Sequence, residues 1–394
     1  MRIKFQFDLS AEERQTNQSI QSAIDRWWRT FLEKTGDLHA LFKRQQDWDL
    51  PEWMEQNLGA ISSNIMWEFG QGLLGGHRLV ITPESRRHLR PLVAQILQRA
   101  PKIDGWEFYP YRLPEDEKMA GLTVDARQGA RLDQMRFILS PGQFNRVDIR
   151  CIVPADYPED KQKATGFVAI ESLLGEEMLD RWIGYIDYEK AAPYPTEAVP
   201  PGDLLSAMRR LVQTLIMKLP NTSWIGRAEG SEWTSFKVNP KRGLADYPSR
   251  LDLLTQISAI PELHQCVFSG AVFDSDRFSK CGETFAYVKV DGAGGLPPWG
   301  FQDRAQIDDA LSTALEGAGL GTVIGGGNGL RYCYTDLALL NVEAAVPVIR
   351  ETLTRGGVSI RSWLLFFDDN FASEWIGVFP ESPPPPMENL ENES

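Results

Sequence analysis

The sequence predicts an α+β fold, in which a helical N-terminal region is followed by two modules of split βαβ topology with antiparallel or mixed sheets. Three observations predict it. Apolar residues recur at helical spacing over about the first 60 residues, β-type runs then alternate with amphipathic helices, and a similar order of elements returns near the C-terminus. With 394 residues, the chain is long enough for two or three domains.

Composition limits the classes of function. The chain carries 41 basic and 54 acidic residues, a net charge of −13, which argues against wrapping nucleic acid or lying on an anionic membrane. Four cysteines are too few for a disulfide framework, and no apolar run has the length of a signal peptide or a membrane helix. We therefore expect a cytoplasmic protein without a cofactor, and no oligomeric state is indicated.

Residues 1–60 are predicted to be a helical N-terminal region. One apolar stripe includes Ile24, Trp27, Trp28 and Phe31, and Gly36 is placed to end that helix. Pro51 suits the first turn of a later helix.

Residues 61–190 are predicted to form the first ferredoxin-like module. Strands at 65–69 and 78–81 flank a glycine-rich turn at 70–76, and an amphipathic helix follows Pro83. An aromatic strand covers 106–111, a hairpin joins 135–139 to 147–153, and a helix at 167–179 precedes a strand at 182–188. One sheet with helices on one face would accommodate this order.

Residues 191–262 are predicted to be a connecting region. Four prolines within 191–202 indicate a linker or rigid loop, and an amphipathic helix begins at Asp203. A short strand at 233–238 and a helix at 251–257 complete the region.

Residues 263–380 are predicted to form the second ferredoxin-like module, with a hairpin of 266–273 and 284–290, and helices near 307–315 and 341–353. Strands at 322–324 and 330–340 flank the run GGGNG, where Asn328-Gly329 is typical of a hairpin turn. The last strand covers 359–367. Residues 381–394, with four consecutive prolines and only acidic charges, are predicted to be a disordered acidic tail.

Three stretches carry a resemblance to known proteins. They are Trp27-Trp28-Arg29-Thr30-Phe31, WEFG at 67–70 leading into HRLVITPES, and LVAQILQRAPKIDGWEFYPYRLP at 92–114. Through them the first 190 residues or so resemble a bacterial family defined by a domain of unknown function, which implies a fold but no activity. In topology alone, the C-terminal module is similar to ferredoxin-like regulatory domains, a group that includes small-molecule sensors and protein inhibitors of ribonucleases.

Two sets of residues are candidates for an interaction site. Arg86, Arg87 and Arg90 form a small basic patch near the start of a helix, and they could bind a phosphate or a carboxylate-rich partner or else form surface ion pairs. Tyr109 and Tyr111 share one face of the aromatic strand, which another part of the chain or a partner would cover.

No residue is assigned a catalytic role, because neither a GxSxG nor a GK[ST] motif is present. Asp368 and Asp369 are weak candidates for metal ligands, since oxygen ligands past a buried strand suit a hard cation, although a solvated turn is favoured.

The expected function is a non-catalytic binding or regulatory protein that acts through protein–protein contacts, in an inhibitory or immunity-like role. Its acidic surface suits a basic protein partner. Two alternatives remain: a small-ligand sensor with a site between the two modules, and a metal-assisted enzyme that uses Asp368 and Asp369.

Overall fold

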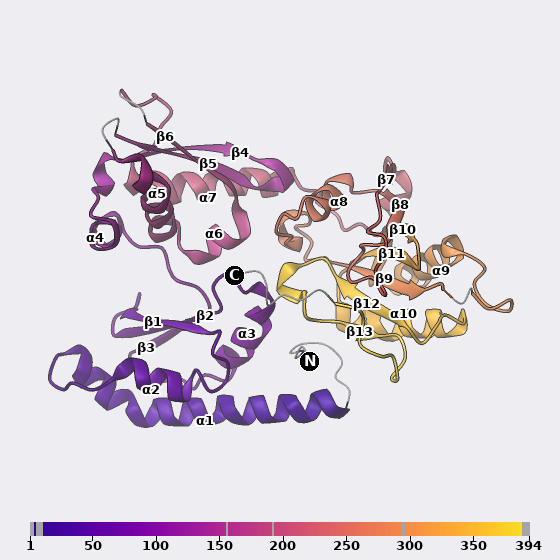
Figure 1. The fold of residues 1–394 in the computed structure, drawn as a ribbon, viewed down its shortest axis with the longest axis horizontal. Helices are drawn as coiled ribbons and strands as arrows, with labels where there is room; N and C mark the ends of the chain where they lie inside the picture. The colour runs from indigo at the N-terminus through magenta and orange to yellow at the C-terminus, as the bar shows by residue number, and fades with distance from the viewer. Residues whose placement is uncertain (1–3, 5–10, 155–156, 191–192, 294–295, 388–394) are drawn as a thin grey trace. The chain divides into compact units, whose positions relative to one another are not determined.

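The computed structural model describes residues 4, 11–154, 157–190, 193–293 and 296–387. The chain divides into two units, Glu12–Lys218 and Met1–Ala11 with Leu219–Ser394. Both contain helices and sheets (Figure 1). Among the described residues, no helix is both long and apolar enough to cross a membrane.

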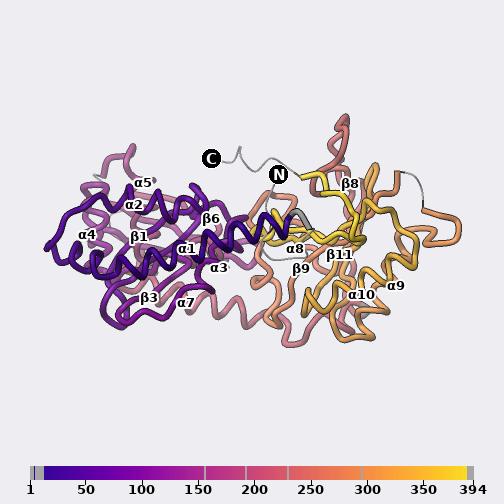
Figure 2. The backbone as a smooth tube through the Cα atoms, turned by 90° about the horizontal axis from the view of Figure 1, so that it is seen from below, coloured from indigo at the N-terminus to yellow at the C-terminus, as the bar shows by residue number. Residues whose placement is uncertain are grey.

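The first unit begins with a long helix that covers a small aromatic sheet. Helix α1 (Ala11–Phe42) runs unbroken through Gly36, where it was predicted to end, and α2 (Leu50–Asn57) follows it (Figure 2). Strands β1 (Met66–Gln71), β2 (His77–Thr82) and β3 (Trp106–Tyr109) lie in that order, with β1–β2 antiparallel and β2–β3 parallel. Trp28 and Phe31 of α1 pack edge-on against the rings of Phe108 and Trp106, at centroid distances of 4.8 and 4.9 Å. The N-terminal helices therefore cover one face of the predicted aromatic strand.

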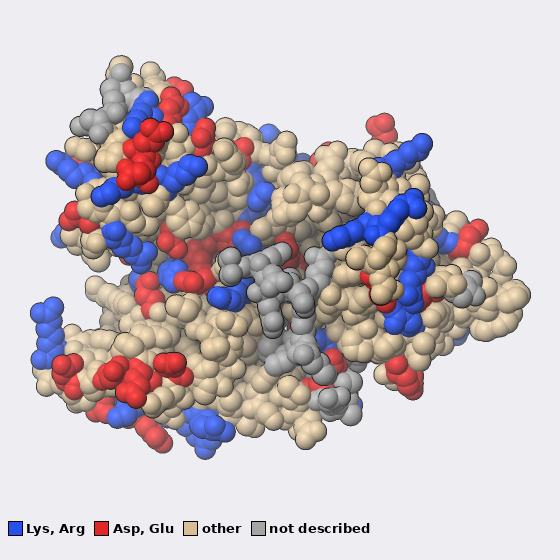
Figure 3. Space-filling view, in the orientation of Figure 1, with Lys and Arg blue, Asp and Glu red and all other residues tan. Residues whose placement is uncertain are grey.

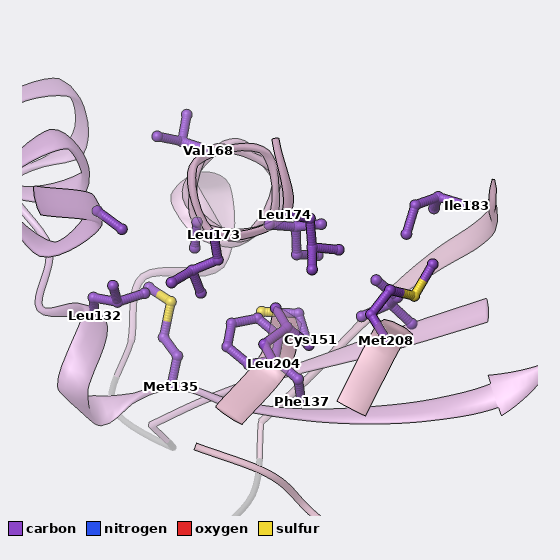
Figure 4. Packing of buried hydrophobic residues seen from close by; sticks show 14 of the residues in the cluster. Leu132, Met135, Phe137, Cys151, Val168, Leu173, Leu174, Ile183, Leu204 and Met208 are labelled. Carbon is purple, nitrogen blue, oxygen red and sulfur yellow. The ribbon is translucent and has the colours of Figure 1, made fainter. Parts of the chain in front are cut away.

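The rest of the first unit is a second small sheet packed on helices. Helix α3 (Arg90–Gln98) crosses from β2 to β3 in the first sheet. The elements that follow are α4 (Glu117–Gln128), β4 (Arg136–Pro141), β5 (Val147–Val153), α5 (Glu159–Leu174), α6 (Glu176–Trp182), β6 (Ile183–Lys190) and α7 (Pro201–Lys218). Phe137 and Cys151 of the sheet face Leu173 and Leu174 of α5 (Figure 4). Burial raises the pKa of the Cys151 thiol to about 12, so this cysteine is unreactive.

Residues 61–190 form two three-stranded sheets, β1-β2-β3 and β4-β5-β6, where one ferredoxin-like sheet was predicted. Helix α4, which was not predicted, lies between them in the chain. Only Ala120 and Val124 of this helix are buried, so few apolar positions in the sequence mark it. Asp116 caps its start, and Gly129, at φ +63°, ends it. The helix predicted at 167–179 is also two helices, because Gly175 (φ +75°) separates α5 from α6.

The second unit contains a seven-stranded sheet in the order β13-β12-β9-β11-β10-β8-β7, with every neighbouring pair antiparallel. Helices α9 (Arg304–Gly317) and α10 (Val342–Arg355) lie side by side and share one apolar core with the sheet (Figures 1 and 2). The other elements are β7 (Thr234–Lys237), β8 (Leu253–Ser258), α8 (Pro261–Phe268), β9 (Thr284–Asp291), β10 (Gly321–Gly329), β11 (Tyr332–Leu339), β12 (Ser362–Phe366) and β13 (Ile376–Gly377).

Two short elements of this unit have the opposite type to the prediction. The helix predicted at 251–257 is strand β8, which pairs with both β7 and β10. The strand predicted at 266–273 is instead the end of helix α8, which begins at Pro261 and ends at Phe268, followed by a turn and a loop. Short apolar runs do not distinguish strand from helix by periodicity, so pairing with distant strands decides the outcome.

The run GGGNG lies within strand β10 and not in the predicted hairpin turn. Asn328 pairs with Cys333, so the chain reverses a few residues later. The glycines allow neighbouring groups to approach: a Cβ on Gly327 would lie 2.5 Å from the Thr255 carbonyl oxygen, and one on Gly329 would overlap the Asp252 carboxylate. Close strand packing thus requires glycine here.

The C-terminal segment also differs from the prediction. Residues 381–387, predicted to be disordered, lie against β12: Ser382 and Pro385 are buried, and Trp363 Nε1 donates to the Pro383 carbonyl at 2.6 Å. Residues 388–394 of the predicted tail lie outside the described residues.

Replacing Gly327 with alanine should lower the free energy of unfolding of the second unit by about 1–3 kcal/mol, because the added methyl group overlaps the β8 backbone. Chemical denaturation measures the change. Gly317→Ala is the matched control: nothing lies within 4 Å of a Cβ at this helical position, so it should be neutral or slightly stabilising. Equal stability of the two variants would contradict the role assigned to the glycine run.

A pair of histidines joins the end of α1 to β2. His39 Nδ1 lies 2.9 Å from His77 Nε2, and the rings of Phe42 and Trp106 pack on His77 at about 5 Å. Burial lowers the pKa of His77 below its ordinary value of 6.5, and the charges of His39 and Lys43 lower it further. The folded chain therefore resists protonation at His77.

Acidification should destabilise the first unit through this pair. As pH falls through 6.5, the unfolded chain takes up a proton at His77 while the folded chain does not, so stability present above that pH is lost below it. We expect His77→Gln to lose less unfolding free energy than wild type between about pH 7.5 and about pH 5.5. Denaturation at the two pH values tests this, and an equal loss in both proteins would refute it.

Candidate functional site

Two of the three predicted interaction arginines are held inside the first unit. Arg87 forms an ion pair with Asp180 at 2.6 Å, and the buried Arg90 pairs with Glu176 at 2.8 Å and donates to the Pro110 carbonyl at 2.9 Å. Arg86 is exposed. The basic patch read from the sequence is therefore largely neutralised by acids of α6.

Acidic side chains from several elements surround Arg112. Arg112 pairs with Glu84, with Glu171 at 3.3 Å and with Glu68 at 3.5 Å, and its backbone N–H donates to Glu176 at 3.0 Å. Together with Arg87 and Arg90, these contacts make a network that ties both small sheets of the first unit together.

The two predicted tyrosines have different surroundings. Tyr111 lies under the Arg90 guanidinium, whose carbon is 3.9 Å from the ring centroid, and burial raises the pKa of its hydroxyl. Tyr109 is partly buried and donates a hydrogen bond to Glu107. Burial and that bond raise the pKa of Tyr109 to about 12.

Glu107 fixes the turn between β1 and β2. Its carboxylate accepts the backbone N–H groups of Leu73 at 3.1 Å and Leu74 at 2.8 Å. The bond from Tyr109 and these two backbone bonds lower the pKa of Glu107. A Cβ on Gly72 would overlap the Glu107 carboxylate, so glycine is needed for it to enter the turn.

The turn presents two leucines to solvent. The side chains of Leu73 and Leu74 are 68% and 93% exposed, and we call residues 70–76 the leucine tip. Sequence analysis identified the turn but not its role. In the sequence, the pair of large apolar residues between glycines could have indicated this role, because turns usually carry polar residues.

A second polar cluster covers the sheet of the second unit on the face opposite α9 and α10. Asp336 in β11 is fully buried; its carboxylate accepts from Arg250 Nη1 at 2.8 Å and Gln256 Nε2 at 2.9 Å, and lies 3.3 Å from His264 Nε2. Burial raises the pKa of Asp336, but Arg250 and His264 outweigh it and hold the pKa below its ordinary value. Asp336 therefore remains charged.

Beside Asp336 lies the buried amine of Lys289. Lys289 in β9 donates to the backbone carbonyls of Tyr247 and Ser249, and its nitrogen is 4.2 Å from the Tyr332 ring centroid. Burial lowers the pKa of Lys289 to about 7, against the opposing effects of Asp252 and Asp246. With its donors already bound to backbone oxygens, Lys289 anchors the covering segment to the sheet.

A cavity of about 420 Å³ lies on this same face. Its lining includes Arg250, Tyr287, Phe367, Asp368, Asp369 and Glu374. This volume is within the range of small-molecule sites. Sequence analysis selected Asp368 and Asp369 but missed Arg250 and the aromatic walls, which come from distant segments.

The structure places the two weak metal candidates in hydrogen bonds with a neighbouring loop. Asp368 accepts from the backbone N–H and hydroxyl of Ser275, and Asp369 accepts from the N–H of Phe273. Over the part of the chain that is described, no group of three or more His, Cys, Asp or Glu side chains is arranged to hold a metal ion.

Comparison of the chain with known protein families, with curated proteins and with solved structures found no match.

Arg90→Met should destabilise the first unit by about 3–5 kcal/mol, because it leaves Glu176 buried without its partner. Arg86→Ala is the matched control; its side chain is exposed, so the change should stay within about 0.5 kcal/mol. Chemical denaturation compares them. If Arg90→Met were as stable as Arg86→Ala, the network would not hold the unit together.

Proposed function

We propose that this chain is a non-catalytic binding or regulatory protein that contacts another protein through the leucine tip, in an inhibitory or immunity-like role. The observation that carries the proposal is the exposure of Leu73 and Leu74 on a turn that Glu107 holds in place. Because the turn is already ordered, binding would lose little conformational entropy.

The kind of partner follows from the tip and the charge. Two adjacent leucines suit an apolar pocket, where burial of each side chain contributes about 1.5–3 kcal/mol. The net charge of −13 favours a partner of positive charge and disfavours an anionic membrane or nucleic acid. On the face drawn in Figure 3, Lys and Arg side chains are scattered among Asp and Glu side chains.

The architecture of the second unit supports a regulatory role by analogy alone. The strand order β12-β9-β11-β10, with α9 and α10 on one face, supports the ferredoxin-like interpretation of this module. Ferredoxin-like folds serve many functions, so the proposal depends on the tip and not on this topology.

The double variant Leu73→Ser/Leu74→Ser should bind the partner about 100-fold more weakly, as expected from losing two apolar contacts. Tagged proteins would be used to capture partners from lysate of the source cells, and affinity for the captured protein would be measured. Stability should not change, because both side chains are exposed.

Leu122→Ser/Met217→Ser is the matched control, since these side chains of the first unit are 56% and 68% exposed. The control should bind the same protein as wild type. Capture of the same protein at wild-type affinity by the tip variant would refute the proposal.

A further inference from the structure

Asp368 is a buried carboxylate without a cationic partner in the described chain. It is 7% exposed, and within the described part of the chain its carboxylate oxygens accept from the backbone N–H of Ser275, at 2.6 Å, and from the Ser275 hydroxyl. Burial raises the pKa of Asp368 to about 7; the Ser275 bonds oppose this, and the charges of Asp274 and Asp276 add to it. A buried acid in such surroundings is costly to ionise unless a cation comes to it.

The cavity beside Asp368 carries further negative charge. Asp369 and Glu374 also line it, and Glu374 is buried. Arg250 is the basic side chain in the lining, and its charge is directed to the fully buried Asp336. Among the described residues of the lining, three side chains are carboxylates and one is a guanidinium.

The walls of the cavity are apolar and aromatic. Phe268, Tyr287, Phe367 and Phe371 contribute rings to the lining. Aromatic faces attract cations, and they also accept the apolar body of a ligand. Carboxylates combined with aromatic rings are the surroundings in which proteins recognise organic ammonium groups.

The loop at the cavity already binds an ammonium group of this chain, through an aromatic ring and a backbone carbonyl. Lys4 Nζ lies 3.7 Å from the centroid of the Trp375 ring and donates to the Trp375 carbonyl at 3.0 Å. Trp375 directly follows the cavity residue Glu374. This loop is therefore chemically suited to ammonium groups.

We propose that this cavity binds a small organic amine in its ammonium form, with an aromatic or aliphatic body, and that Asp368 is the carboxylate that receives the charge. A metal ion is disfavoured because, among the described residues, no three or more His, Cys, Asp or Glu side chains are arranged to hold one. The last seven residues of the chain, ENLENES, carry only acidic charges, so charge also disfavours them as the occupant. The site is independent of the leucine tip, which belongs to the other unit.

Two probes of similar shape and opposite charge test the proposal on the full chain. Isothermal titration calorimetry would compare 2-phenylethylamine, a cation at neutral pH, with 3-phenylpropanoate, an anion. We expect the amine to bind at least about tenfold more tightly than the carboxylate, which corresponds to one favourable charge contact. Equal affinity, tighter binding of the carboxylate, or no heat from either probe at millimolar concentration would overturn the proposal.

A pair of isosteric variants then locates the site. Asp368→Asn should weaken amine binding at least about tenfold, since it removes the charge and retains the shape. Asp309→Asn is the matched control, because Asp309 is an exposed acid on α9, which packs on the other face of the sheet. This variant should bind the amine as wild type does. Wild-type affinity in Asp368→Asn would overturn the assignment; the two probes decide the matter on the wild-type chain even where that variant does not fold.

Discussion

The carboxylate of Asp336, fully buried in the middle of the seven-stranded sheet, is the constraint on which the second unit depends. A charge in that position must be neutralised and hydrogen-bonded, because its desolvation would otherwise cost several kcal/mol. Arg250, Gln256 and His264 supply those contacts, and they come from the segment before β8, from β8 itself and from α8. The elements that cover this face are thus joined to the sheet through one acid.

The same pairing also shapes the cavity. The Arg250 guanidinium lies within about 5.5 Å of the ring centroids of Tyr287, Tyr334 and Phe367, and two of those rings line the cavity. Asp336 holds the arginine at the wall, and its charge is therefore directed to Asp336.

In the first unit, too, charged side chains are paired within the unit, but the surface left for a partner is different. Arg87, Arg90 and Arg112 are engaged by acids of the same unit, so they join its two sheets and are not free for a partner. What this unit offers to a partner is apolar: Leu73 and Leu74, on a turn that Glu107 holds from within. The protein-binding proposal and the amine proposal depend on different residues in different units, and either can fail without the other.

The sequence by itself determined the elements whose signals are local. The stripe of α1, helix α10 after Asn341 and the strand Val147–Val153 depend on residues a few positions apart, and each lies close to where the local sequence pattern places it. Asp368 and Asp369 could also be selected as candidates, because acids past a buried strand are visible locally. Only the tertiary structure decided that GGGNG is a strand, that residues 253–258 pair as β8, and that Arg90 and Arg250 meet acids 86 positions away. Pairing of distant strands and burial of distant charges leave no periodic trace in the chain, since their energies arise only once the segments are packed together.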